Sequence, residues 1–377
     1  MNSACGGTSG LGLPKGSEES FWRCLLTDLY CGLSYRQISL SIPNPATRNR
    51  NWWPMKPISD EQLAFFQEQG YLLVPGLLEV EADLDPIMRE YEGVLDNLAR
   101  ELYAEGTIAS PYEELPFGER VTRIYGESGK VHAQYFDFSL PQGGVKEDTP
   151  MWVGPAVFRG LTNPRLLDAV EAFIGSEIYS NPVQHVRIKP PEHLTPINPE
   201  TGRVQLGITP WHQDNGVVLP EADNTLMLTV WFPLTDATID NGCLCVIPGS
   251  HRRGLLHHCP GNWGLEVPDA IFEKSDAIPV PMRRGDVLFL QKLTVHSSLS
   301  NKSDMIRWSF DLRYNPIGQA TGRGAFPGFI ARSKTKPETA LTDPALWEKL
   351  WHDTRQTMSH TEDSPFNRWS KDHPVCA

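Results

Sequence analysis

The hydrophobic pattern of the chain changes character at about residue 178. Upstream of this point, apolar positions recur with the spacing of amphipathic helices. The segment SDEQLAFFQEQG at 59–70 has Ser59 as a candidate N-cap and Gly70 as a stop signal. Two further helices are predicted at 79–104 and 164–174. Residues 1–58 show no sustained periodicity, and we interpret them as an N-terminal extension.

Downstream of residue 178 the pattern is that of short β-strands. Seven apolar or alternating runs are bounded by turn residues, at 178–188, 225–235, 242–249, 277–282, 286–291, 294–299 and 305–316. This spacing is typical of an antiparallel sandwich or barrel. We therefore expect a mainly β domain with flanking helices at 59–332. The remainder, 333–377, is charge-rich and is predicted to form one helix near 344–357 and a loose, solvated tail.

The last of these runs has two chemically different faces. Its apolar and polar residues alternate, Trp308, Phe310, Leu312 and Tyr314 with Arg307, Ser309, Asp311 and Arg313. Successive side chains of a strand project to opposite sides, so each set occupies one face. A buried polar face must be partnered or hydrated. We expect the apolar face to pack against helices and the polar face to line a ligand cavity.

Composition narrows the class of protein. The chain has 377 residues, 40% of them hydrophobic, and no run of eighteen apolar residues, so a membrane-spanning role is not expected. The net charge of −12 argues against a nucleic-acid partner. The seven cysteines form no CxxC pair and are predicted to be reduced thiols. With neither a signal peptide nor a peroxisomal C-terminal tripeptide, a cytoplasmic protein is expected.

The stretch WHQDNG at 211–216 is the first candidate for chemistry. His212 and Asp214 are two positions apart, so in extended backbone both can point at one atom. Gln213 then points away and is interpreted as a replaceable spacer. Imidazole together with carboxylate suits iron(II), and two histidines with one carboxylate leave open coordination positions. Taken alone, the stretch fits an ordinary turn, whose polar residues satisfy its backbone, much better than it fits a metal site.

His296 is the best candidate for the third ligand. Eleven histidines are available, and the residue that singles out His296 is Arg307, eleven positions later on the polar face of its strand. The planar guanidinium of Arg307 could clamp a carboxylate through two parallel hydrogen bonds, and Ser309 could add a third.

Five ordered segments carry a family resemblance. The HxD motif at 212–214, DNGCLCVIPGSHRRG at 240–254, GDVLFLQKLTVHSS at 285–298, RWS at 307–309 and DEQLAFFQEQGYLLVPGLL at 60–78 resemble the phytanoyl-CoA dioxygenase family of iron(II)- and 2-oxoglutarate-dependent oxygenases. The resemblance implies a double-stranded β-helix (jelly-roll, cupin-like) core. It implies iron(II) held by His212, Asp214 and His296, and the 5-carboxylate of 2-oxoglutarate held by Arg307. Oxygen would be consumed, with ascorbate as a reductant.

Weaker carry-overs concern the cosubstrate pocket. Ser298 and Ser309 match positions that help to hold 2-oxoglutarate in similar proteins, although serines near strand ends are also common turn caps. Gln184 and Lys189 precede the HxD motif where relatives place a polar cosubstrate contact; the alternative for Lys189 is a surface lysine. Trp231 would wall the pocket or serve as a core aromatic.

The reaction implied is hydroxylation of a small molecule, such as a secondary metabolite or lipid-like acid, with release of succinate and carbon dioxide. Related halogenases replace the carboxylate ligand by a small residue, so the presence of Asp214 favours hydroxylation, desaturation or ring closure. The segments 104–155 and 317–332 are expected to form a lid. Two alternatives stay open: a cupin-like metal dioxygenase or isomerase that does not use 2-oxoglutarate, and a catalytically silent jelly-roll binding protein.

Overall fold

The computed structural model describes residues 57–361 and 366–376. Most of the predicted N-terminal extension, 1–58, lies outside them. The described residues form seven α-helices: α2 (Asp60–Gln69), α3 (Asp85–Ala104), α4 (Phe117–Ser128), α5 (Ala133–Phe136), α6 (Pro155–Leu161), α7 (Pro164–Ile174) and α8 (Pro344–Ser359). The first strand follows α2, and the other strands lie between α7 and α8. The predicted helices at 59–70, 79–104 and 164–174 correspond to α2, α3 with a preceding π-helical turn, and α7. None of the described helices is long and apolar enough to cross a membrane.

The strands form two larger sheets and a hairpin. A six-stranded antiparallel sheet has the order β1-β8-β3-β10-β2-β11, a three-stranded sheet has the order β7-β4-β9, and β5 pairs with β6. The bounds are β1 Tyr71–Val74, β2 Ile178–Lys189, β3 Leu228–Pro233, β4 Leu244–Val246, β5 Cys259–Gly261, β6 Gly264–Glu266, β7 Ile278–Val280, β8 Val287–Gln291, β9 His296–Ser298, β10 Arg307–Pro316 and β11 Phe329–Arg332.

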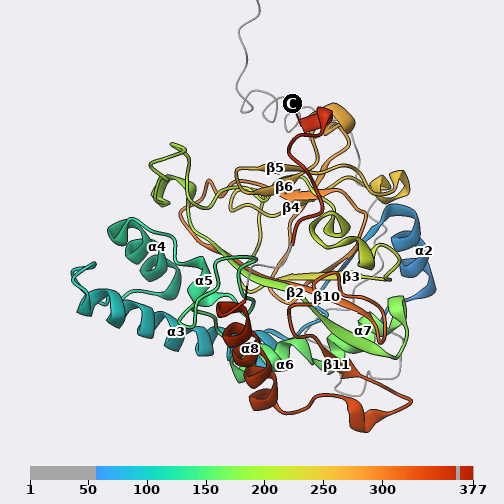
Figure 1. Ribbon diagram of the computed structural model, residues 1–377, viewed down its shortest axis with the longest axis horizontal. Coiled ribbons are helices and arrows are strands. Elements are labelled where there is room, and N and C mark those ends of the chain that lie inside the picture. Colours follow the sequence, from blue (N-terminus) through green and yellow to red (C-terminus); the bar gives the residue numbers. More distant parts are fainter. Residues whose placement is uncertain (1–56, 362–365, 377) are drawn as a thin grey trace, which may run out of the picture. The chain divides into compact units, whose positions relative to one another are not determined.

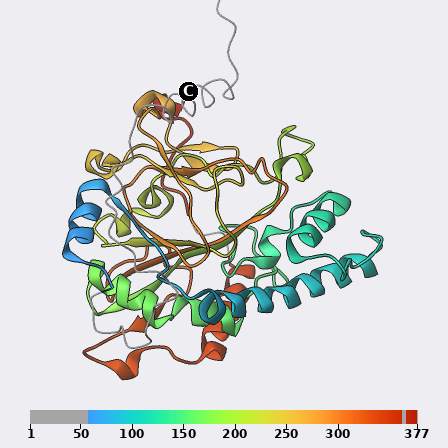
Figure 2. The ribbon, with the colours of Figure 1, turned by 180° about the vertical axis from the view of Figure 1, so that it is seen from behind.

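The sheets lie in two layers with helices behind the larger one. In Figure 1, β4, β5 and β6 lie above β2, β3 and β10, and α6, α7 and α8 lie below these three strands; Figure 2 shows the same layers from behind. The expectation of a mainly β, antiparallel jelly roll with flanking helices is confirmed. Because the described strands stay in separate sheets, the jelly roll is open rather than a closed barrel.

Helix α2 ends at a residue that contacts the turn at 291–294, just before His296. Ser59 Oγ accepts a hydrogen bond from the Gln62 backbone nitrogen, and the Gln62 side chain accepts one from the Ser59 nitrogen, which caps α2. The helix ends at Gly70, whose φ of 79° lies in the left-handed region that glycine tolerates. The Gly70 carbonyl accepts hydrogen bonds from the Gln291 nitrogen at 2.9 Å and from Thr294 Oγ1 at 2.6 Å. The turn just before His296 is therefore fixed by α2.

Strand β10 has the two faces that its alternation predicts. Its apolar residues are fully buried against the helical layer: Trp308, Phe310, Leu312 and Tyr314. Phe310 contacts Tyr91 of α3 edge-on, and Tyr314 Oη donates to the Leu161 carbonyl at the end of α6. The opposite face carries Arg307 and Arg313 into the space between the sheets. A single strand thus joins the core to the site.

The C-terminal segment differs from the loose, solvated tail expected. The helix near 344–357 is present as α8, but Trp347 and Trp351 on it are fully buried. Residues 366–376 pack onto the body, where Cys376 forms a disulfide with Cys259 of β5. The expectation of reduced thiols is therefore wrong at these two cysteines. They are 117 residues apart, and local spacing cannot reveal a pair that only the fold brings together.

Candidate active site

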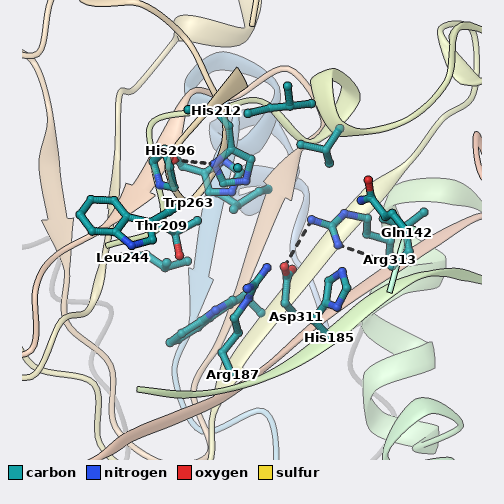
Figure 3. Close-up of a pocket in the computed structure, with 18 of the residues that line it drawn as sticks. Gln142, His185, Arg187, Thr209, His212, Leu244, Trp263, His296, Asp311 and Arg313 are labelled. Carbon is teal, nitrogen blue, oxygen red and sulfur yellow. Dashed lines mark hydrogen bonds and ion pairs between the residues drawn. The ribbon is translucent and has the colours of Figure 1, made fainter. Parts of the chain in front are cut away.

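The two predicted histidine ligands lie side by side at the end of the three-stranded sheet. The backbones of His212 and His296 form an isolated antiparallel bridge, with N···O distances of 2.9 and 3.0 Å. This bridge places the ring centroids 4.2 Å apart with the ring planes tilted by 49°, and Figure 3 shows the two side chains next to each other. One ligand atom from each of His212, Asp214 and His296 lies within 4.8 Å of the others. The structure therefore brings all three predicted ligands to one point.

Carbonyl groups orient both imidazole rings. The Nδ1 atom of His212 lies 2.8 Å from the Pro210 carbonyl, and Nδ1 of His296 lies 3.0 Å from the Thr294 carbonyl. Each Nδ1 therefore carries the hydrogen, and each Nε2 lone pair is left for a metal. The two Nε2 atoms lie 3.9 and 4.0 Å from the carboxylate oxygens of Asp214.

Two neighbours hold the Asp214 carboxylate. Arg313 of β10 forms an ion pair with Oδ1, and Thr229 of β3 donates a hydrogen bond to Oδ2 at 2.5 Å. All three side chains are buried. Alternation on β10 predicts that Arg313 faces the cavity, but it does not predict the partner, because that partner belongs to a different segment of the chain.

The protonation states of His212 and Asp214 match those of metal ligands. Burial and the neighbouring His296 lower the pKa of His212 to about 3, so this imidazole is neutral at neutral pH. Burial alone would raise the pKa of Asp214, but Arg313, His296 and His212 together hold it below its usual value. Neutral imidazoles and an ionised carboxylate are the forms that bind divalent ions. A donor set of two imidazoles and one carboxylate would hold iron(II).

The predicted cosubstrate residues cluster around Arg307. The Arg307 guanidinium is buried, donates to Ser309 Oγ at 2.5 Å and lies 5.5 Å over the Trp231 ring. Lys189 is 4% exposed, so it is not the surface lysine of the alternative interpretation; its Nζ donates to Ser298 Oγ at 2.8 Å. Burial and the adjacent Arg307 hold the pKa of Lys189 well below its usual value.

Gln184 does not join this cluster. It lines neither the cavity that contains the triad nor the adjoining cavity of about 240 Å³ that Lys189 and Arg307 line. The pairing of β2 with β10 shifts register between His185 and Asn181, so alternation along β2 is interrupted where Gln184 lies. Its predicted contact with the cosubstrate has no support in the described geometry.

The main cavity has a volume of about 440 Å³ and reaches from the triad to the surface. The segments predicted as a lid contribute Gln142 and Arg323 to its lining. Two further walls were not expected: the β5–β6 hairpin with Trp263 and Leu265, and Asn367 of the C-terminal segment. The disulfide between Cys259 and Cys376 joins these two walls. Their short turn-rich sequences carry no periodicity that would place them over the site.

The interpretation of Gln213 as a replaceable spacer is wrong. Its side chain does point away from the metal ligands, but it is fully buried. Its amide nitrogen donates to the carbonyls of Gly254 and Leu293 at 2.9 and 2.7 Å, and its amide oxygen accepts from the Leu256 nitrogen at 2.7 Å. The backbone nitrogen of Gln213 donates to His258 Nε2 at 2.9 Å. Gln213 therefore ties the HxD motif to two other loops.

Comparisons with known proteins agree with this arrangement. The family model for phytanoyl-CoA dioxygenase (PhyH) matches residues 66–309. A phytanoyl-CoA dioxygenase domain-containing protein 1 from Danio rerio is 25% identical over 275 residues, which cover 67% of this chain and 88% of that protein. The peroxisomal phytanoyl-CoA dioxygenase of Homo sapiens is 26% identical over 253 residues, 66% of this chain and 65% of that enzyme. Among solved structures, the apo form of the non-heme monooxygenase ThoJ shares the fold, with a TM-score of 0.50, 19% identity and coverage of 78% of this chain and 96% of that one.

Proposed function

Because the chain belongs to the phytanoyl-CoA dioxygenase family, we propose that it is an iron(II)- and 2-oxoglutarate-dependent oxygenase that hydroxylates a C–H bond of a small organic molecule. Succinate and carbon dioxide are the coproducts. The observation that carries this proposal is the convergence of His212, Asp214 and His296 beside a buried Arg307 in one cavity.

The residues of the cavity have separate tasks under this proposal. His212, Asp214 and His296 hold the metal, which together with 2-oxoglutarate and oxygen supplies the oxidant for the C–H bond. Arg307 binds the distal carboxylate of 2-oxoglutarate through charge-assisted hydrogen bonds. Ser309 accepts from one guanidinium nitrogen and fixes the orientation of the Arg307 side chain. Trp231 closes one wall and keeps water from this ion pair.

Asp214 supports hydroxylation rather than halogenation. Its carboxylate stands where a halide would need an open metal position, and Arg313 and Thr229 keep it ionised and in place. Desaturation and ring closure begin with the same removal of hydrogen and diverge from hydroxylation afterwards. The product therefore distinguishes these reactions.

The test is turnover by the purified protein. With iron(II), ascorbate, 2-oxoglutarate, oxygen and a small-molecule extract of the source cells, we expect more succinate than without extract and an extract component that gains one oxygen atom. Loss of two hydrogens without gain of oxygen would indicate desaturation or ring closure instead. The Asp214→Ala variant is the matched control and should form no product. Equal succinate from both proteins would contradict the proposal.

Arg307 separates the proposal from a cupin-like enzyme that does not use 2-oxoglutarate. Such an enzyme would bind iron and be indifferent to Arg307→Ala. Under the proposal, this change leaves a carboxylate without its charge partner and weakens 2-oxoglutarate binding by at least about tenfold. A silent binding protein would show neither 2-oxoglutarate binding nor turnover.

A further inference from the structure

The main cavity is strongly positive although the chain is acidic. Four arginines line it, Arg187, Arg307, Arg313 and Arg323, against a single lining aspartate, Asp311. The chain as a whole carries a net charge of −12. A cleft lined by one sign of charge concentrates ligands of the opposite sign. The lining therefore selects anions.

Three of the four arginines are accounted for by their surroundings or by the proposed function. Arg313 pairs with Asp214 and, at 3.3 Å, with Asp311, and it donates to the Val183 carbonyl. Arg307 is assigned to the distal carboxylate of 2-oxoglutarate. Arg187 is exposed at the rim, where water solvates its charge.

Arg323 is different, because it is a buried cation with no counter-ion among the residues that the structure describes. It is 2% exposed, and within the described ranges no carboxylate forms an ion pair with it. Its Nη2 atom donates to the Val217 carbonyl at 2.8 Å, whereas Nε and Nη1 find no hydrogen-bond partner in residues 57–361 and 366–376. Burial and Arg313 lower its pKa to about 10, so the group stays charged at neutral pH. A buried charge without a partner is costly, and such a site gains most when an anion enters.

The surroundings of Arg323 fix it in a position to receive such an anion. The guanidinium carbon lies 5.7 Å from the Phe326 ring centroid and 5.6 Å from that of Phe366, within the range of cation–π contacts. Phe366 directly precedes Asn367, which lines the same cavity. A guanidinium held by two rings and one carbonyl loses little freedom on binding a ligand.

The rest of the wall indicates the other part of the ligand. Apolar and aromatic residues line the same cavity as Arg323 and the two histidines, among them Pro210, Val217, Trp263 and Leu265. This lining suits a hydrocarbon or aromatic body.

We propose that Arg323 binds a carboxylate of the primary substrate, and that this substrate is an organic acid with an apolar body. That the bound acid is the substrate of the oxygenase rests on the proposed function. The binding of an acid at Arg323 does not depend on iron. The carboxylate occupies the free hydrogens on Nε and Nη1, and the apolar body extends along the cavity toward the triad.

Calorimetric titration without oxygen tests the proposal, using protein loaded with iron(II) and 2-oxoglutarate. The probes are 4-phenylbutyrate, indole-3-acetate and octanoate, each paired with its neutral alcohol. We expect at least one acid to bind saturably, and about tenfold or more tightly than its alcohol. Arg323→Gln should reduce this binding by a similar factor without changing 2-oxoglutarate affinity, and Arg323→Lys should restore part of it. Arg89→Gln, an exposed arginine of α3, is the control for loss of one positive charge.

Each contrary result is decisive. Equal binding of acids and alcohols, no saturable binding of any acid, or unchanged binding by Arg323→Gln would overturn the proposal. Acid binding that is abolished by Arg307→Ala and not by Arg323→Gln would place the acid in the cosubstrate site and overturn it as well. Thermal unfolding of Arg323→Gln, expected at or above the wild-type temperature because an uncompensated charge is removed, excludes misfolding as the cause. The titration is repeated without iron and 2-oxoglutarate. Acid binding that depends on Arg323 in this form supports the Arg323 site even if the protein fails to load iron. Failure to load iron contradicts only the proposed function.

Discussion

The side chains that would hold iron owe their geometry to atoms outside the ligand set. Pro210 and Thr294 carbonyls turn the two imidazoles, while Arg313 and Thr229 hold Asp214. Such outer partners of metal ligands typically govern affinity by one to two orders of magnitude. We therefore expect the residues that contact the ligand side chains, and not the ligands alone, to set the affinity for iron.

Removing the Arg313 guanidinium should weaken the metal site while leaving the three ligands in place. For Arg313→Met we expect an iron(II) affinity about tenfold to a hundredfold lower, because Asp214 loses the ion pair that orients it. Anaerobic competition with a chelator measures this affinity. Arg307→Met is the matched control, since it lies on the same face of β10 and should lower 2-oxoglutarate affinity instead. Equal iron affinity in Arg313→Met and the wild type would show that Arg313 does not position Asp214 for metal binding.

Gln213 should matter for stability. Gln213→Ala removes the three hydrogen bonds of a buried side chain and leaves their backbone partners unpaired, so we expect the free energy of unfolding to fall by about 2–4 kcal/mol. Urea denaturation measures the change. Gln67→Ala, an exposed glutamine of α2, should stay within about 0.5 kcal/mol of the wild type. A Gln213 variant as stable as this control would reinstate the spacer interpretation.

The sequence predicts which residues face the cavity better than it predicts what they contact. Alternation along β10 places Arg307, Ser309 and Arg313 on one face, and the ordered motifs single out three residues that the fold brings together, His212, Asp214 and His296. The partner of Arg313 and the three bonds of Gln213 come from segments far away in the chain, and no spacing rule reaches them.

At the scale of elements, the C-terminal segment is the least expected part of the site. Arg368 forms two hydrogen bonds with the Asp223 carboxylate, and Trp369 Nε1 donates to the Gly216 carbonyl at 2.6 Å. The Trp369 ring also stacks on His258, which accepts from the Gln213 nitrogen. The segment thus braces the loop that carries His212 and Asp214. The polar composition of the segment led us to expect solvent exposure. Composition does not show which residues the segment contacts after folding.

Loss of this brace should loosen the metal-binding loop. For Trp369→Ala we expect faster loss of iron(II) to a chelator and a lower melting temperature, because the hydrogen bond to Gly216 and the stack on His258 disappear together. Lys371→Ala, an exposed change two residues later, serves as the control. If both variants release iron at the wild-type rate, the segment only covers the surface.

The disulfide makes a separate prediction about the same element. Peptide mapping without reductant should yield one fragment that links Cys259 to Cys376. Cys376→Ser should lower the free energy of unfolding by about 2–4 kcal/mol, because the bond closes a long loop. Finding both cysteines as free thiols in protein purified without reductant would contradict the pairing.

At the scale of the whole molecule, the helices lie behind the six-stranded sheet (Figure 1). Strand β10 of that sheet lines the cavity with Arg307 and Arg313, and β9 of the three-stranded sheet contributes His296. The helices and strands follow from local signals, namely caps, stop residues and alternation. Local signals do not predict the open arrangement of the sheets or the positive cavity in an acidic chain. Both features depend on which surfaces meet after folding.

The measurement that tests the central claim most directly is an anaerobic titration of the iron(II)-loaded protein with 2-oxoglutarate, followed by visible absorption. We predict a metal-to-ligand charge-transfer band that saturates at one equivalent per chain, that requires at least about tenfold more 2-oxoglutarate in Arg307→Ala, and that is absent in Asp214→Ala. No band in the wild type, or the same 2-oxoglutarate affinity in Arg307→Ala, would contradict the account.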